Sequence, residues 1–76
     1  MDNERMLNYR SRLQKLQGDN VGMAREFFKF KKSFPVIRTE DEHWIKQGIK
    51  LFFTYGGVIN DETQVYFTDL KDSELH

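Results

Sequence analysis

One stretch decides the fold of this chain: residues 39–57, which read TEDEHWIKQGIKLFFTYGG. Thr39 and Glu42 form the S/T-x-x-E pattern of a capping box, in which the two side chains satisfy free backbone N–H groups at a helix start. The acids that follow Thr39 sit where the helix dipole favours negative charge. The two closing glycines are typical of a helix end. The stretch therefore predicts a helix over residues 40–55.

This helix has a broad apolar face. Gly48 falls between Ile45 and Ile49 on that face, where a missing side chain permits close approach by another helix. We therefore expect the helix to lie against the rest of the core. The predicted core residues are Trp44, Ile45, Ile49, Phe52, Leu13, Leu16, Phe27 and Phe30.

Two further helices are predicted upstream. Residues 3–17 place Met6, Tyr9, Leu13 and Leu16 at spacings of three and four, with Gly18 at the position expected for a helix-ending glycine.

Residues 20–33 repeat this spacing with Met23, Phe27, Phe30 and Phe34, and Pro35 ends the segment. The alternation of Phe and Lys at residues 28–31 also fits a half-buried strand. Helix and strand both remain open for residues 27–32.

The region beyond the glycines predicts β structure. Two β-prone runs, Val58-Ile59 and residues 65–67, flank a polar loop, which is typical of a hairpin over residues 58–68. Residues 69–76 form a polar tail. The predicted fold class is α-dominated (α+β), a small three-helix domain over residues 1–76 with a short C-terminal β-hairpin.

Composition excludes several classes of protein. The 76 residues contain no cysteine, which removes disulfides, thiolate nucleophiles and cysteine-based zinc sites. No apolar run reaches the roughly 18 residues of a transmembrane helix. No signal-peptide apolar region follows Met1 to Arg5, so we expect a cytoplasmic protein without a membrane partner.

The sequence also lacks a catalytic set. His43 and His76 are its two histidines, and no serine lies in a nucleophile motif. Its paired carboxylates are expected in helix caps and loops, because a chain this short seldom builds a cleft around two of them. We expect no enzymatic activity, no metal, no cofactor and no small-molecule substrate.

Charge is split along the chain. Residues 1–38 hold nine basic and four acidic residues, a net of +5, whereas residues 39–76 hold three basic and eight acidic residues, a net of −5. Such asymmetry suggests a polar partner or self-association. Neutralisation of the two halves within the fold is the alternative.

Aromatic content suggests a protein-binding surface. Eleven aromatic residues exceed what a domain of this size hides easily, and exposed aromatics favour protein contacts. We expect a regulator or inhibitor that occupies a partner's surface, or a homodimer. The candidate contact residues are Phe28, Phe53, Tyr55 and Tyr66, with the acidic Asp61 and Glu62.

The alternative is a nucleic-acid-binding regulator. Arg25, Lys29 and Lys32 are spaced to share one helical face, as a row of phosphate-binding cations would be. The first helix adds candidates of its own, Arg5, Arg12 and Lys15. The competing interpretation is an ordinary amphipathic helix with buried phenylalanines and solvated lysines.

Overall fold

The computed structural model describes residues 2–34 and 39–68. They form three α-helices, α1 (Asp2–Lys15), α2 (Asn20–Lys32) and α3 (Thr39–Thr54), followed by one 3-10 turn, η1 (Gln64–Tyr66). The three predicted helices are confirmed, and their ends differ from the predicted ones by at most two residues. Residues 27–32 are helical, not extended. The predicted tail at 69–76 lies outside the described residues.

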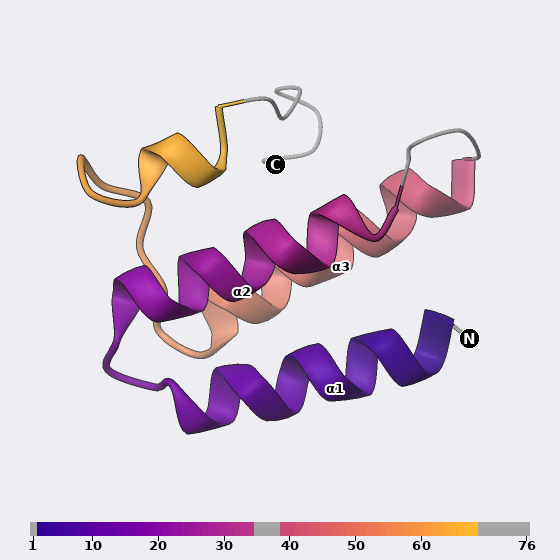
Figure 1. The fold of residues 1–76 in the computed structure, drawn as a ribbon, viewed down its shortest axis with the longest axis horizontal. Coiled ribbons are helices and arrows are strands. Elements are labelled where there is room, and N and C mark those ends of the chain that lie inside the picture. Colours follow the sequence, from indigo (N-terminus) through magenta and orange to yellow (C-terminus); the bar gives the residue numbers. More distant parts are fainter. Residues whose placement is uncertain (1, 35–38, 69–76) are drawn as a thin grey trace.

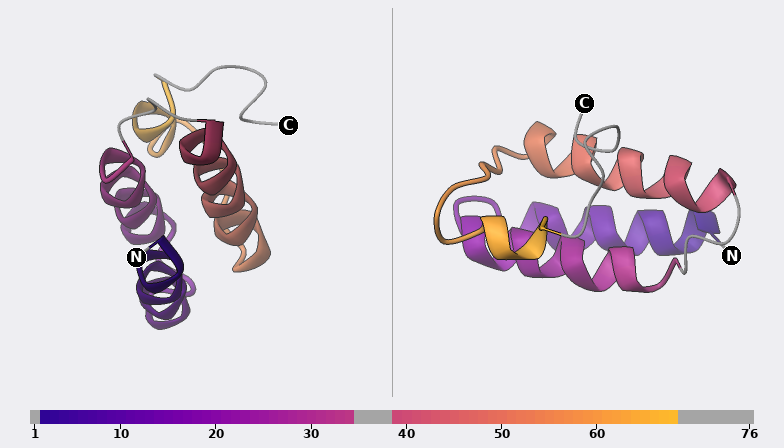
Figure 2. Two further views of the ribbon diagram at one scale, coloured as in Figure 1. Left: turned by 90° about the vertical axis from the view of Figure 1, so that its right-hand side faces the viewer. Right: turned by 90° about the horizontal axis from the view of Figure 1, so that it is seen from above.

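The helices pack in a triangular arrangement (Figure 1). α2 runs opposite to α1 and α3, and each helix contacts both others. The left view of Figure 2 looks roughly along the three helices, and η1 contacts α2. The first half of α1 therefore lies beside the last half of α2.

The core draws on all three helices and on residues that follow α2 and η1. Its buried apolar residues are Tyr9, Leu13, Met23, Ala24, Phe27, Phe30, Phe34, Ile45, Ile49, Phe52 and Phe67. Six of the eight predicted core residues are among them. Leu16 and Trp44 instead are partly buried and pack against the edge of the core. Leu16 lies just past the end of α1, and Trp44 lies in the second turn of α3.

The three helices meet at Gly48. The Tyr9 hydroxyl donates a hydrogen bond of 2.7 Å to the Gly48 carbonyl, and the Tyr9 ring stacks on Phe30 at 4.4 Å between centroids. A Cβ atom at Gly48 would lie only 2.7 Å from Cε2 of Phe30. The close helix approach predicted at Gly48 is confirmed.

The predicted hairpin over residues 58–68 is wrong. All of these residues are described, and they form an irregular segment, a turn and η1 without a strand. Val58 and Val65, two of the β-prone residues, are 56% and 61% exposed. Phe67 instead is buried, with its ring 5.0 Å from that of Phe27 and 5.2 Å from that of Phe52.

Side chains take the place of strand pairing in this segment. The Asn20 amide donates to the Val58 carbonyl at 2.8 Å and accepts from the Val58 N–H at 2.8 Å. The hydroxyl of Thr63 donates to the same carbonyl at 2.9 Å and accepts from the Asn60 N–H at 2.8 Å. Asn60 Oδ1 accepts from the backbone of Glu62 and Thr63. Such local bonds compete with a β-ladder for the same backbone groups.

Substitution Gly48→Ala tests the close contact at the helix junction. Helix propensity alone would stabilise the protein by about 1 kcal/mol. Crowding of a buried ring costs about 1–3 kcal/mol, and we expect crowding to win because Phe30 is held by Tyr9. Denaturant titration should show net destabilisation, and the penalty should shrink in a Phe30→Leu background. An equal loss of stability in both backgrounds would contradict the conclusion that the Phe30 ring crowds a side chain at position 48.

The buried Tyr9 hydroxyl predicts alkaline sensitivity. Burial, helped by the negative charge of Glu26, raises the pKa of Tyr9 far above its usual value. The neutral phenol is therefore favoured in the folded state, whereas an unfolded tyrosine loses its proton near about pH 10. The free energy of unfolding should be unaffected by this group below about pH 10 and should fall above it by up to about 1.4 kcal/mol per pH unit.

Denaturant titrations of wild type and Tyr9→Phe across this alkaline range provide the measurement. The other tyrosines are the same in both proteins, so the difference between the two slopes isolates Tyr9. At neutral pH the free energy of unfolding of Tyr9→Phe should be about 1–2 kcal/mol lower than that of wild type, because the variant has no hydroxyl to donate to the Gly48 carbonyl. Parallel alkaline slopes would show that Tyr9 ionises freely in the folded protein.

Thr63→Val tests the side-chain bonds that replace the hairpin. Thr63 is fully buried, and the isosteric valine removes the three hydrogen bonds of its hydroxyl, to the Val58 carbonyl, the Asn60 N–H and Asn60 Oδ1. We expect a loss of about 1–3 kcal/mol in the free energy of unfolding. Thr54→Val is the matched control, because the exposed Thr54 hydroxyl bonds only within its own helix, to Lys50, among the described contacts. Equal effects of the two substitutions would refute the role of Thr63.

Candidate functional site

A groove with a volume of about 250 Å³ runs between α1 and α2. We call it the basic groove. Its lining residues are Arg5, Asn8, Tyr9 and Arg12 from α1, Lys29 and Phe30 from α2, and Ser33 just beyond α2. Tyr9 and Phe30 are buried, so they form the floor, whereas the charged residues are exposed at the rim. The groove therefore offers polar donors above an aromatic base.

Helical spacing explains why these residues converge. Arg5, Asn8 and Arg12 are three and four residues apart, which places them on one face of α1. Lys29 and Ser33 are four residues apart along α2 and its end. The two helices are antiparallel (Figure 1), and both sets of residues line the same groove.

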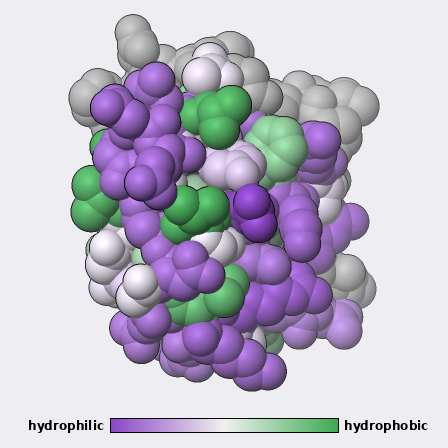
Figure 3. All heavy atoms as spheres, turned by 60° about the vertical axis from the view of Figure 1, so that its left-hand side comes forward, coloured by the Kyte–Doolittle hydropathy of each residue, from purple (hydrophilic) through white to green (hydrophobic). Residues whose placement is uncertain are grey.

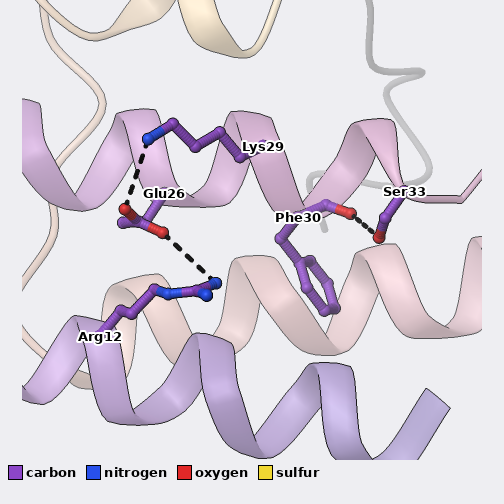
Figure 4. A network of polar contacts seen from close by, with 5 residues as sticks. All are labelled: Arg12, Glu26, Lys29, Phe30 and Ser33. Atoms are coloured by element: carbon purple, nitrogen blue, oxygen red, sulfur yellow. Dashed lines mark hydrogen bonds and ion pairs between the residues drawn. The ribbon is translucent and has the colours of Figure 1, made fainter. Parts of the chain in front are cut away.

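The arginine at one end of the groove is held in place. An Arg5 Nη1 donates to the Ser33 carbonyl at 2.9 Å, and its guanidinium carbon lies 5.1 Å from the centre of the Phe34 ring. This contact joins the start of α1 to the end of α2. The Ser33 hydroxyl donates to the Phe30 carbonyl at 2.6 Å, as Figure 4 shows.

The other two cations share one carboxylate. Arg12 Nη1 lies 3.9 Å from Glu26 Oε2, and Lys29 Nζ lies 3.7 Å from Glu26 Oε1 (Figure 4). The side chains of Arg12 and Lys29 are 60% and 72% exposed, whereas that of Glu26 is 16% exposed. At this end of the groove two exposed cations therefore face one carboxylate.

A second feature lies where α2 meets η1. The Phe28 and Tyr66 rings make an edge-on contact at 5.6 Å between centroids. The ammonium groups of Lys32 and Lys31 lie 4.4 Å and 5.0 Å from the centre of the Phe28 ring. Arg25 Nε donates to the Tyr66 hydroxyl at 3.1 Å. We call these five residues the aromatic–cation cluster.

The structure divides the predicted row of nucleic-acid-binding cations. It brings Arg5, Arg12 and Lys29 together in the basic groove. Arg25 and Lys32 lie in the aromatic–cation cluster, because their groups contact Tyr66 and Phe28. Lys15 lines neither the groove nor this cluster. The predicted residues thus make two separate features rather than one row.

The predicted aromatic contact residues are also dispersed. Phe28 and Tyr66 belong to the aromatic–cation cluster. The Tyr55 hydroxyl accepts from Arg10 and Gln14 of α1, and the hydrogen bond from Arg10 lowers the pKa of Tyr55. Phe53 is 44% exposed, beside the buried Phe52.

The two acidic candidates and the apolar residues at the surface do not join these aromatic residues into one continuous surface. Asp61 and Glu62 lie exposed in the turn after α3. On the side of the molecule drawn in Figure 3, apolar side chains reach the surface in separate places among hydrophilic ones.

Sequence reasoning missed two polar residues that line the groove and the carboxylate that contacts its cations. Asn8 and Ser33 line it, and Glu26 bridges two of its cations. The spacing of Arg5, Asn8 and Arg12 carries a signal for one shared face. No signal in the sequence gives the register of α1 against α2, which decides that Arg12 meets Glu26.

The chemistry available in the groove is anion binding. Guanidinium, ammonium, amide and hydroxyl groups all donate hydrogen bonds, and the charged donors match carboxylate or phosphate oxygens. His43 is exposed and lies edge-on to Trp44 at 5.5 Å. Within residues 2–34 and 39–68, no group of three or more potential ligands could hold a metal ion.

The same part of the chain contains no helix that is both long and apolar enough to cross a bilayer. Comparison with protein-family models, with curated proteins and with solved structures gives no match.

Proposed function

We propose that this protein is a non-enzymatic protein-binding module, a regulator or inhibitor that covers an acidic segment of a partner protein. The observation that carries this proposal is the convergence of Arg5, Arg12 and Lys29 on one groove. Three cations from two helices form a surface that attracts negative charge before contact and orients it on arrival.

The form of the groove favours side-chain carboxylates. Arginine binds a carboxylate through two parallel N–H donors, which fixes direction as well as distance. Asn8 and Ser33 add neutral groups beside the charges. A standard protein interface covers about 800 Å² per partner, so the groove serves as the anchor within a larger contact.

Nucleic-acid binding is the second candidate, and the aromatic–cation cluster supports it. Single-stranded nucleic acids bind where bases stack on aromatic rings and cations meet the phosphates. Phe28 and Tyr66 supply rings, while Arg25 and Lys32 supply charge close by. This candidate uses different residues from the basic groove, so the two can be separated by substitution.

Binding of a fluorescein-labelled polyglutamate peptide, followed by fluorescence anisotropy, tests the leading proposal. The double variant Arg12→Gln, Lys29→Gln should bind at least about tenfold more weakly, since each charge-assisted hydrogen bond contributes about 1.5 kcal/mol or more. Lys50→Gln, an exposed lysine on α3 outside the groove, is the charge-matched control for one position. It should stay within about twofold of wild type.

Single-stranded DNA serves as the competing probe in the same assay. Tighter binding to DNA than to the peptide, lost in Phe28→Ala and retained in the groove variant, would support the second candidate instead. Absence of binding to both probes at low salt would contradict both candidates, because electrostatic association is strongest there.

A further inference from the structure

The Glu26 carboxylate contacts the same two cations that a bound anion would contact, Arg12 and Lys29. Its two carboxylate oxygens face Arg12 and Lys29 separately, at 3.9 Å and 3.7 Å, and it lies between α1 and α2 (Figure 4). The carboxylate therefore already satisfies, in part, two of the three cations that rim the basic groove. Arg5 is held independently, by the Ser33 carbonyl and the Phe34 ring.

We propose that Glu26 is a built-in competitor that sets the affinity of the basic groove for the carboxylates of an acidic peptide segment. This inference rests on the proposed function. In the free protein Glu26 holds Arg12 and Lys29 above the groove. When an acidic segment binds, its carboxylates form hydrogen bonds with these two cations, and the contacts of the cations with Glu26 are lost.

The distances indicate that this exchange is within reach. Charge-assisted N–H···O hydrogen bonds are about 2.7–2.9 Å long, and both Glu26 contacts exceed that range by a wide margin. The cations are also well exposed, which screens their attraction to Glu26. An incoming carboxylate that forms short hydrogen bonds therefore replaces weak contacts rather than strong ones.

Charge balance identifies the occupant. Arg12 and Lys29 carry two positive charges against the one carboxylate of Glu26 that both contact, so this part of the groove keeps positive charge while the competitor is in place. A peptide with glutamate or aspartate side chains complements that charge and supplies the planar group that arginine binds with two donors. Removing Glu26 should strengthen binding, an effect opposite to that of removing the cations.

The experiment compares Glu26→Gln with wild type in binding the polyglutamate peptide. We expect binding about three- to tenfold tighter, the range that loss of two exposed ion pairs allows, and a steeper decline with salt. Glu26→Asp keeps the charge but withdraws it by one methylene, so it should tighten binding less. Glu62→Gln, in the turn at 61–63, makes the same charge change away from the groove and should alter affinity less than about twofold.

The outcomes separate this inference from the proposed function. Unchanged or weaker binding by Glu26→Gln, or an equal gain in Glu62→Gln, overturns the competitor role even where the cation variants lose binding as proposed. A gain for single-stranded DNA without a gain for the peptide overturns the acidic-peptide occupant. Cation variants that bind like wild type overturn the groove itself, and the competitor role with it. Circular dichroism of each variant checks that the helices are intact.

Discussion

The rest of the structure depends on the hydrogen bond from the Tyr9 hydroxyl to the Gly48 carbonyl. It joins the first helix to the third across 39 positions of sequence. A buried phenol needs a partner, since an unpaired polar group in the core costs about 1–3 kcal/mol. Glycine supplies this partner at a point where any side chain would meet Phe30. One residue thus gives both the acceptor and the space for the ring beside it.

This junction also builds the candidate binding site. Tyr9 and Phe30 stack in the core and at the same time form the floor of the basic groove. Their contact fixes the register of α1 against α2. With that register, Arg5 reaches Ser33 and Arg12 reaches Glu26. The groove is therefore a consequence of core packing rather than a separate feature placed on it.

The sequence predicts what depends on local periodicity and fails where distant residues decide. The capping pattern at Thr39 and the spacing of apolar residues predict three helices within one or two residues of their observed ends. The hairpin fails because Asn20, 38 positions away, takes the backbone N–H and carbonyl of Val58. β-propensity reflects fit to a pleated, half-buried surface, and the structure offers Val58 and Val65 no such surface.

The site follows the same rule. One face of α1 carries Arg5 and Arg12, which the spacing alone predicts. Lys29 shares a helical face with Arg25 and Lys32 in the sequence pattern, yet their charged groups contact different residues. Lys32 and Lys29 contact Phe28 and Glu26 of the same helix, α2, whereas Arg25 contacts Tyr66 of η1. Helical spacing could predict the two contacts within α2, but the contact with Tyr66 depends on how the segment after α3 packs.

The split of charge along the chain does not predict the ion pairs of Arg12 and Lys29 in the basic groove. In the basic groove the partly neutralising carboxylate, Glu26, comes from the basic half of the sequence and not from the acidic half. Its pair with Lys29 spans three positions of one helix and needs only α2, whereas its pair with Arg12 needs α1 packed in register. The full cation set therefore exists only while α1 is docked. Because a partner that binds across both helices favours the docked state, binding and folding stability are coupled through the same contacts.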